Sequence, residues 1–564
     1  MKSLKRLLSY LLKYKGITIL IIIFSLISTI LNLITPLYIG KTIDEIVLSE
    51  YSKLIKSIIT LVSIYLIIFI SESFLVKLIN KLEYNVTQKI REDLFKKITT
   101  VKIKTLDSTK YGEIINKFSV DISNISNVIS NGILKCISGI ITVIFASIIM
   151  IKINITMSII VMISAPIIYY VSRFITNKTN KFFKLRTQKM EDFNGMANEF
   201  ISNEKTIKDF AYNTKAISKF NKMSNELQSV SIKTQFFSSL TNPITRYISH
   251  ISYITIGVVG VILLMYKKIT IGNISSFLLY TNTFSKPFNE ITAIIAEIQQ
   301  GIASAEKIFE FLDEEDEKNL NNTVSKIIGN IEFKNVFFSY NKSQKFIENL
   351  NLKVNKGEVV AIVGKTGAGK TTIANLLLRL YDIDSGKILI DGKDIYNYDL
   401  EFLRKNIGIV LQDTKLFTAT VKENIAYGKE NVTDEQIINV AKIVHADEFI
   451  NKLPNGYNTI INNESMLSLG EIQLINIARI LLLKPPIVVL DEATSNIDLV
   501  NEINIQNALL DIMKSATTFV IAHRLSTIKN ADKIIFIENG NIVEEGTHNE
   551  LMNKKGKYYE LYQN

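Results

Sequence analysis

The sequence predicts two joined parts. The first is an α-helical domain with six membrane-spanning segments, and the second is an α/β domain whose mostly parallel sheet carries a phosphate-binding loop. Long apolar runs, each near the length needed to cross a bilayer, fill residues 1 to about 300. The remainder alternates short apolar strands with helical patterns, and one strand runs directly into a glycine-rich loop and a helix.

The composition excludes several classes of protein. A chain of 564 residues exceeds what one hydrophobic core usually supports, so we expect two or more folding units. Hydrophobic residues make up 47% of the chain and the mean hydropathy is +0.20, which excludes a disordered protein. The single cysteine, Cys136, excludes a disulfide framework and a multi-cysteine metal site, and the four histidines argue against a histidine-rich one.

Six apolar segments approach the roughly 20 residues that a transmembrane helix needs: Ile17–Leu37, Ile58–Leu75, Ile133–Ile151, Ile155–Ile175, Ile248–Tyr266 and Ile271–Ile295. A tight hairpin, little more than residues 152–154, separates the third from the fourth. Before the first segment, leucines at helical spacing with basic residues between them predict an amphipathic helix on the membrane surface, and a packed helix is the alternative. The first segment is longer than the apolar core of a secretion signal, and no small-residue cleavage site follows it.

The placement of Lys and Arg predicts the orientation in the membrane. Residues 77–117 hold ten of them and residues 173–246 hold thirteen, whereas the short turns near residues 152 and 267 hold one and two. Basic residues accumulate on the cytoplasmic side, so we expect both termini, the two long connections and the α/β domain in the cytoplasm, below the cell membrane. The net charge of +11 then reflects topology and requires no nucleic-acid partner.

A polar boundary separates the two parts. The acidic run 313–317 is followed by polar residues, and we predict a membrane domain over residues 1–312, a linker over 313–328 and an α/β domain over 329–564. The long connections within the first part mix apolar and charged residues, so we expect helices that continue the spans into the cytoplasm.

The glycine-rich loop carries the clearest chemical signal. It follows the apolar strand 359–363, precedes a helical run, and reads Gly364, Lys365, Thr366, Gly367, Ala368, Gly369, Lys370, Thr371, Thr372. This is the context that a P-loop requires, and it argues against a chance glycine turn. Glycines let backbone N–H groups surround phosphate oxygens at the start of a helix. We expect Lys370 to contact the β- and γ-phosphates and the Thr371 hydroxyl to bind Mg²⁺.

A second apolar strand supplies carboxylates. Residues 487–490 precede Asp491 and Glu492, which places both acids at the carboxyl edge of a parallel sheet. Asp491 is expected to hold Mg²⁺, and Glu492 to polarise the attacking water as a general base. His523 follows another apolar strand, where it could hydrogen-bond the γ-phosphate, although a lone histidine is commonly structural.

Taken together, these residues resemble the ATP-binding cassette transporters, specifically the half-transporter exporters that fuse one membrane domain to one nucleotide-binding domain. The resemblance covers nearly the whole chain. It implies that Tyr340 stacks on adenine, that Gln412 senses Mg²⁺ and faces the membrane domain, and that His523 is the switch histidine. The run from Asp491 to Asp498 matches the second carboxylate motif and the loop that follows it.

The resemblance also implies how such chains assemble. ATP and Mg²⁺ would lie between two nucleotide-binding domains, each site combining the P-loop of one chain with the signature motif of the other. In the membrane half, residues 107–113 resemble the first cytoplasmic coupling helix and residues 206–210 the approach to the second. Residues 277–309 resemble the sixth span and its continuation toward the nucleotide-binding domain.

The chain departs from the family at the signature, where Leu-Ser-Gly-Gly-Gln is replaced by Leu467, Ser468, Leu469, Gly470, Glu471. Ser468 and Gly470 are kept and are expected to contact the nucleotide across the dimer. Leu469 adds bulk where backbone must approach phosphate, and Glu471 adds negative charge beside a polyanion. Because the catalytic residues are intact, we predict a heterodimer in which this chain supplies a good P-loop face and a poor signature face. A homodimer with harmless sequence drift is the alternative.

The sequence does not identify the transported molecule. Ionisable residues inside the spans are functional candidates, although they could equally pair structurally or line a water-filled vestibule: Glu72, His250, Lys286 and Glu290. We predict ATP-driven export of a lipophilic drug, a lipid or a peptide across the cell membrane. An importer built on the same fold and an ATP-gated or regulatory membrane subunit are the alternatives.

Overall fold

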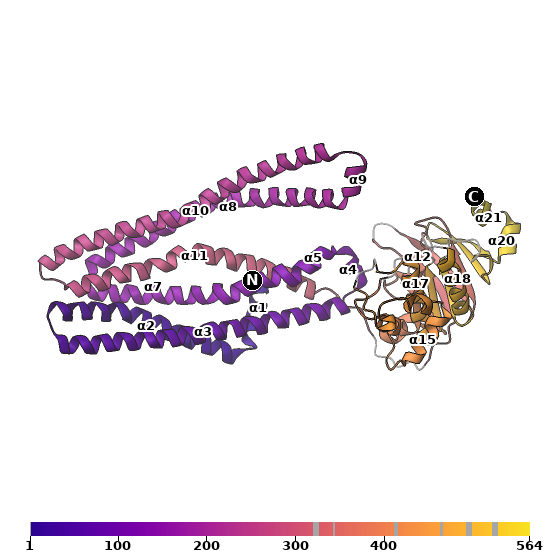
Figure 1. Ribbon diagram of the computed structural model, residues 1–564, viewed down its shortest axis with the longest axis horizontal. Helices are drawn as coiled ribbons and strands as arrows, with labels where there is room; N and C mark the ends of the chain where they lie inside the picture. The colour runs from indigo at the N-terminus through magenta and orange to yellow at the C-terminus, as the bar shows by residue number, and fades with distance from the viewer. Residues whose placement is uncertain are drawn as a thin grey trace. The chain divides into compact units, whose positions relative to one another are not determined.

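The computed structural model describes residues 2–319, 326–341, 345–410, 415–462, 466–491, 499–521 and 528–563 (Figure 1). The chain divides into two compact units, one formed by residues 1–99 and 109–314 and the other by residues 100–108 and 315–564. The sequence division assigned residues 100–108 to the membrane domain, whereas the structure packs this segment with the second unit. A helical first unit fused to an α/β unit with a mostly parallel sheet confirms the predicted fold class.

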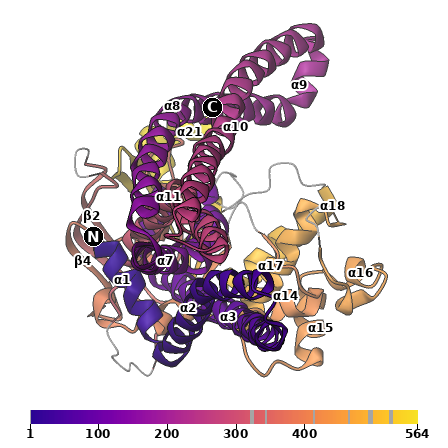
Figure 2. The ribbon, with the colours of Figure 1, turned by 90° about the vertical axis from the view of Figure 1, so that its left-hand side faces the viewer.

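The described part of the first unit is built from seven helices of more than ten residues: α1 (Lys2–Leu12), α2 (Lys15–Val47), α3 (Tyr51–Thr100), α7 (Ile133–Ile153), α8 (Ile155–Ser202), α10 (Asn213–Met265) and α11 (Ile271–Leu312). Short helical segments connect them: α5 (Tyr111–Asn116), η1 (Lys117–Asp121), α6 (Ile122–Asn127), η2 (Val128–Gly132) and α9 (Glu204–Asp209). The predicted helical continuations of the spans are present, since α3, α8 and α10 extend far beyond their apolar runs. Figure 2 shows α8 and α10 running beside each other to the turn that contains α9.

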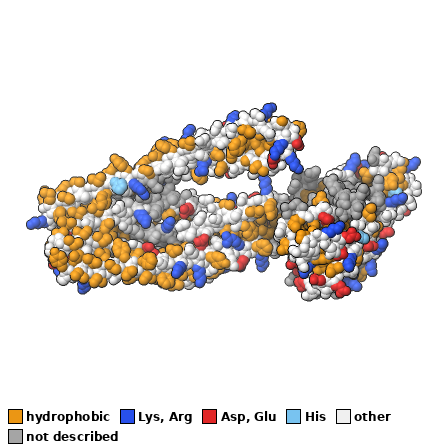
Figure 3. Space-filling view, in the orientation of Figure 1, with side chains coloured by type: hydrophobic (Ala, Val, Ile, Leu, Met, Phe, Trp, Pro, Cys, Tyr) orange, Lys and Arg blue, Asp and Glu red, His pale blue; other side chains and the backbone are white. Residues whose placement is uncertain are grey.

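The surface of the first unit is that of a membrane protein. Large apolar side chains lie exposed along α2, α3, α7, α8 and α10, and Figure 3 shows them crowding one end of this unit. Within the described residues, four helical stretches are long and apolar enough to cross a bilayer, and Ser138–Ile153 is a shorter apolar helix. Together with the six long helices that contain the predicted spans, these surfaces identify a multi-pass membrane protein.

The helices of this unit are joined by specific polar contacts. α7 ends at Ile153 and α8 begins at Ile155, with the Asn154 side chain capping α8 through the Met157 N–H at 3.1 Å, so the predicted tight hairpin is confirmed. α11 is fastened to α2 because Ser276 Oγ donates to the Pro36 carbonyl at 2.7 Å.

The amphipathic helix α1 packs within its own unit. Leu7, Tyr10 and Leu11 are buried, and the Tyr10 hydroxyl donates to Asp93 Oδ2 at 2.7 Å. The Tyr10 ring also stacks on Phe309 with ring centroids 6.0 Å apart. The structure therefore shows the packed alternative for this face of α1, rather than a helix that only lies on a membrane surface.

The described residues of the second unit form two sheets. The antiparallel sheet has the order β2-β1-β4-β5, with β1 (Ile331–Phe338), β2 (Ile347–Val354), β4 (Ser385–Ile390) and β5 (Lys393–Asp394). The larger sheet has the order β10-β9-β3-β8-β7-β6, with β3 (Val359–Val363), β6 (Ile407–Val410), β7 (Ile487–Asp491), β8 (Thr517–Ile521), β9 (Lys533–Glu538) and β10 (Asn541–Gly546). Its strands are parallel apart from β10, which pairs antiparallel with β9.

Helices pack against the larger sheet, and its central strands β3, β7 and β8 are buried on both faces. The helices of this unit include α12 (Lys370–Leu377), α13 (Leu400–Lys405), α14 (Val421–Ala426), α15 (Asp434–Ile443), α16 (Asp447–Ile450), α17 (Leu469–Leu483), α18 (Leu499–Met513), α20 (His548–Lys554) and α21 (Lys557–Gln563). On β3, Ala361 and Val363 enter one hydrophobic cluster while Val360 and Ile362 enter another. This two-sided burial explains why the strand reads as an unbroken apolar run. One further short helix, α4 (Ile103–Ser108), belongs to this unit although its sequence lies between helices of the first.

Candidate functional site

The glycine-rich loop joins β3 to α12, as the sequence predicted. Gly364 directly follows β3, with φ at +156°, and a Cβ there would lie 2.3 Å from the Ile537 carbonyl oxygen. Gly369 caps α12 in the left-handed conformation, with φ at +111°. Both positions therefore require glycine, one because of a close approach and the other because of its backbone angles. The loop is thus fixed in shape by its neighbours.

Lys370 lies inside this loop. Its ammonium donates to the Gly364 carbonyl at 2.6 Å and lies 3.4 Å from the Lys365 carbonyl oxygen. Burial lowers the pKa of Lys370, and the nearby charge of Asp491 partly opposes that shift. The structure therefore brings Lys370, from the start of α12, close to the carboxylate at the end of β7. A buried ammonium held by loop carbonyls is well placed to exchange those partners for phosphate oxygens.

The rest of the loop divides into exposed and buried positions. Lys365, Thr366 and Gly367 form an exposed tip, and Thr371 is exposed on the first turn of α12. Ala368 is buried, and its carbonyl accepts from the Gly540 N–H at 2.9 Å, which anchors the loop to the β9–β10 turn. Thr372 is also buried and faces the aromatic residues described next.

Tyr340 lies at the edge of a cluster of aromatic side chains beside α12. Its hydroxyl lies 3.0 Å from Thr372 Oγ1, so it is attached to the P-loop helix. Its ring meets three others edge-on or tilted, at centroid distances of 4.8 Å to Phe338, 5.5 Å to Phe346 and 5.1 Å to Tyr381. The ring is half-buried. Its stacking on adenine stays a prediction, supported by this attachment to the phosphate-binding helix.

The carboxyl ends of four strands meet at one edge of the sheet. Ile521 at the end of β8 pairs with Ile362 of β3 on one side and with Asp491 of β7 on the other. Val410 of β6 pairs with Leu490 of β7. Three predicted functional residues follow these strand ends in the sequence but lie outside the described residues: Gln412, Glu492 and His523. Their roles as sensor, base and switch, like that of Asp498, stay predictions.

The side chains of Thr371 and Asp491 are of the chemical types that bind Mg²⁺. A magnesium ion in such a site takes few protein ligands and keeps water and phosphate oxygens as the others. The Thr371 hydroxyl is exposed and Asp491 is near Lys370, so the described residues offer a hydroxyl and a carboxylate beside the loop. In the described part of the chain, no group of three or more His, Cys, Asp or Glu side chains gathers into a dedicated metal site.

The altered signature forms the start of α17. Ser468 is the N-cap, and its hydroxyl accepts from the Glu471 N–H at 3.3 Å. Glu471 Oε2 accepts in return from the Ser468 N–H at 2.7 Å and from the Ser468 hydroxyl at 3.0 Å. This reciprocal capping box stabilises the helix and places a carboxylate at its positive end. Gly470 is buried, whereas the Leu469 side chain is 60% exposed.

The segments that resemble coupling helices have a different local structure from the one expected. Residues 107–113 do not form one helix, because α4 ends at Ser108 and α5 begins at Tyr111. The portion attached to the second unit is residues 100–108. Residues 206–210 coincide largely with α9. Sequence reasoning missed Tyr381 altogether, because no local pattern marks a tyrosine just after α12 as a contact of α4.

The ionisable residues of the spans lie in separate places. Glu72 accepts a hydrogen bond from Ser28 Oγ at 3.1 Å, which links α3 to α2. His250 and Lys286 are exposed in the single chain. The side chain of Glu290 lies outside the described residues, so its predicted pairing with Lys286 stays a prediction.

Comparison with known proteins gives two family matches that together follow the two halves of the chain. The family described as ABC transporter transmembrane region matches residues 18–288, and the family described as ABC transporter matches residues 347–495. An uncharacterized ABC transporter ATP-binding protein of Bacillus subtilis (strain 168) is 36% identical over 566 residues, covering 100% of this chain and 94% of the relative.

Two further relatives have more informative descriptions. A putative multidrug export ATP-binding/permease protein of Bacillus subtilis (strain 168) is 32% identical, covering 100% of this chain and 99% of the relative. A fatty acid ABC transporter ATP-binding/permease protein of Mycobacterium bovis (strain ATCC BAA-935 / AF2122/97) is 34% identical, covering 86% of this chain and 77% of the relative.

Proposed function

Because the chain belongs to the ATP-binding cassette transporters and is an ATP-hydrolysing exporter-type protein, we propose that it exports a lipophilic drug or a lipid across the cell membrane as one half of a heterodimer. The descriptions of two relatives, multidrug export and fatty acid transport, support this substrate class. A peptide is the remaining member of the predicted class. The concentration of Lys and Arg in the two long connections supports a cytoplasmic position for both termini and the nucleotide-binding unit.

The proposed nucleotide site uses the loop and the strand ends described above. Backbone N–H groups of residues 364–369 surround the phosphates, and Lys370 exchanges its loop carbonyls for phosphate oxygens. Thr371, Asp491 and Gln412 would hold Mg²⁺, which supplies charge that neutralises the phosphate oxygens when bound. Glu492 accepts a proton from the attacking water, and His523 orients the γ-phosphate.

The heterodimer proposal depends on one observation, the negatively charged Glu471 that caps the start of α17. A helix N-terminus is a natural phosphate-binding position, because its free N–H groups and its dipole attract anions. In this chain the Glu471 carboxylate already occupies that position and engages both the N–H and the hydroxyl of Ser468. Leu469 adds an exposed side chain on the same turn. A partner chain with an unaltered signature would complete this chain's P-loop, while the second site would bind ATP and hydrolyse it slowly.

Vesicle transport tests the proposal directly. Inside-out membrane vesicles that contain the complex should accumulate a fluorescent lipid or lipophilic cation only with ATP and Mg²⁺ present. The matched control is the same complex with Lys370→Ala, which should show ATP-independent partition alone. Accumulation in right-side-out vesicles supplied with external ATP, and none in inside-out ones, would contradict both the proposed direction and the cytoplasmic orientation.

A further inference from the structure

The first cytoplasmic connection is attached to the nucleotide-binding unit in two places. The first is a clasp with the segment that leaves α11, where Thr100 Oγ1 donates to Asp316 Oδ1 at 2.7 Å and the Glu317 N–H donates to the Thr100 carbonyl at 2.8 Å. Lys102 Nζ lies 2.6 Å from Glu315 Oε2 and 4.0 Å from Asp382 Oδ2. These contacts tie residues 100–102 to residues that follow α11.

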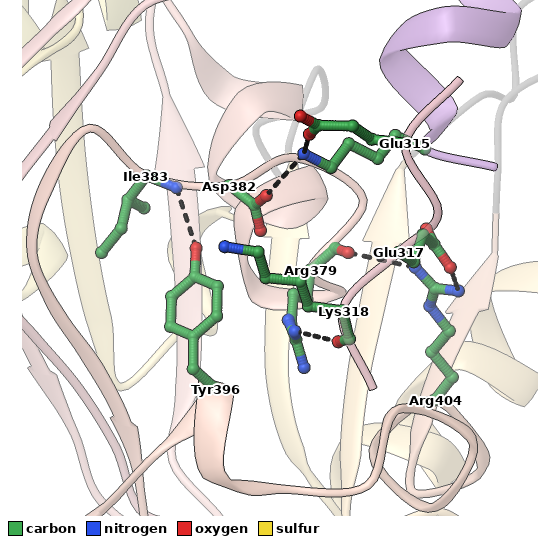
Figure 4. A network of polar contacts seen from close by, with 9 residues as sticks. Glu315, Glu317, Lys318, Arg379, Asp382, Ile383, Tyr396 and Arg404 are labelled. Carbon is green, nitrogen blue, oxygen red and sulfur yellow. Dashed lines mark hydrogen bonds and ion pairs between the residues drawn. The ribbon is translucent and has the colours of Figure 1, made fainter. Parts of the chain in front are cut away.

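The clasp is itself anchored on the nucleotide-binding unit. Arg404 donates two parallel hydrogen bonds to the Glu317 carboxylate, each at 2.8 Å, and Arg379 donates to the Lys318 carbonyl (Figure 4). A bidentate arginine–carboxylate pair fixes direction as well as distance. The clasp therefore holds the connection, but none of these contacts reaches the P-loop.

The second attachment leads toward the nucleotide site. α4 borders a hollow of about 460 Å³ whose walls come from α4 and from the region around α12 and β6: Ile103, Asp107, Leu378, Leu380, Tyr381 and Ile409. At its rim the Tyr381 hydroxyl donates to Asp107 Oδ2. Burial, together with this hydrogen bond to a carboxylate, raises the pKa of Tyr381 above its usual range, so the hydroxyl stays a donor at any physiological pH.

Tyr381 also contacts the residue expected to stack on adenine. Its ring meets the Tyr340 ring edge-on, with centroids 5.1 Å apart and planes at 82°. Tyr340 in turn reaches Thr372 on the first turn of α12. Three successive contacts thus connect Asp107 on α4 with the helix that follows the phosphate-binding loop.

We propose that Tyr381 is a positioning residue that couples the docking of α4 to nucleotide binding, by holding Tyr340 in the orientation that receives adenine. The inference rests on the proposed stacking of adenine on Tyr340. When α4 is docked, Asp107 fixes the Tyr381 ring, and that ring restricts Tyr340. When α4 leaves, both rings gain freedom, and nucleotide binding has to order them again. Coupling of this kind is reciprocal, so bound nucleotide must also favour the docked position of α4.

The test compares single-hydroxyl deletions on the two attachments. Tyr381→Phe removes the hydroxyl that binds Asp107 and keeps the ring, and Asp107→Asn removes the charge of its acceptor. The matched control is Thr100→Val, which deletes one hydroxyl bonded to a carboxylate on the same segment but within the clasp. The full chain in lipid nanodiscs is titrated calorimetrically with Mg²⁺ and the non-hydrolysable analogue AMP-PNP.

We expect Tyr381→Phe and Asp107→Asn each to weaken binding about threefold to tenfold, the usual net scale for one ordinary hydrogen bond. The double variant should bind no more weakly than the weaker-binding single variant, because both substitutions act on the same contact. Thr100→Val should stay within about twofold of the wild type. Thermal unfolding without nucleotide verifies that each variant is folded.

A second readout follows α4 itself. The chain contains no tryptophan, so Lys104→Trp on the exposed side of α4 gives a single reporter. Its emission should change when AMP-PNP binds, and Tyr381→Phe should abolish the change. Wild-type affinity and an intact signal in Tyr381→Phe would overturn the proposal, as would an equal loss in Thr100→Val. A wild-type chain that fails to bind AMP-PNP would instead overturn the proposed nucleotide site.

Discussion

Restoring the signature tests the heterodimer most sharply. The double substitution Leu469→Gly with Glu471→Gln returns the family pattern at the start of α17. Glutamine should preserve the fold of the helix, because Gln436 already closes an equivalent capping box with Thr433 at α15. The perturbation therefore changes charge and bulk on the first turn of α17, and we expect the free energy of unfolding to change by less than about 1 kcal/mol.

The magnitude follows from the charge that is removed. At a separation of about 5 Å and an effective dielectric constant of about 20, one carboxylate repels one phosphate charge by about 3 kcal/mol. Glu471 is half-exposed, so solvent and salt reduce this to about 1–3 kcal/mol. That range corresponds to about a 5- to 150-fold change in closing a site that uses this turn.

Steady-state ATP hydrolysis in nanodiscs, on the complex purified through a tag on this chain, distinguishes the two assemblies. In a heterodimer the fast site does not use this turn, so activity should stay within about twofold of the wild type. In a homodimer both sites use it, and activity should rise about fivefold or more. Glu550→Gln in the similar capping box of α20 is the matched control and should change nothing. A strong rise, or robust ATP-driven transport by this chain alone, would refute the heterodimer.

Substitutions at three further residues address the P-loop face. Glu492→Gln should leave nucleotide affinity nearly intact and slow hydrolysis at least about 100-fold, and a near wild-type rate would assign the base elsewhere. Lys370→Ala removes a charge-assisted contact and should weaken ATP binding, measured by calorimetry, by about 1.5–3 kcal/mol. An unchanged affinity would count against the placement of the phosphates. Tyr340→Ala should weaken ATP binding, whereas Tyr340→Trp should be tolerated and should report bound nucleotide by its fluorescence. If both variants instead lose thermal stability in the absence of nucleotide, Tyr340 is a structural core residue.

The features that sequence alone predicted correctly have local causes. The loop between β3 and α12 could be recognised because the strand, the glycines and the helix are contiguous, and each imposes its own backbone requirement. The spans could be recognised because a bilayer demands long apolar runs whatever the helices pack against. The added negative charge of Glu471 was also recognised, and the structure places it on the first turn of α17.

The features that were missed depend on contacts between distant parts of the chain. Asp107 and Tyr381 are 274 positions apart, and no sequence pattern around either residue predicts the contact between them. The apolar positions of α1 would suit a membrane surface or a protein groove equally well, and the choice is made by Asp93 and Phe309. Residues 100–108 were assigned to the membrane domain because sequence continuity favours it, yet their hydrogen bonds go to residues 315–317.

The P-loop face and the signature face of the nucleotide-binding unit therefore differ in how they can couple bound nucleotide to α4. The P-loop face contains Lys370 and Tyr340, and through Tyr381 it is connected to the chain's own α4. The signature face ends in a helix that its own carboxylate already caps. If this chain completes one fast site with its P-loop, the nucleotide at that site is the one that Tyr381 reports to α4. Tyr381→Phe should then impair coupling in the whole heterodimer, while substitutions at Leu469 and Glu471 leave it nearly unchanged. The reverse order of severity would mean that the signature turn of this chain serves the fast site.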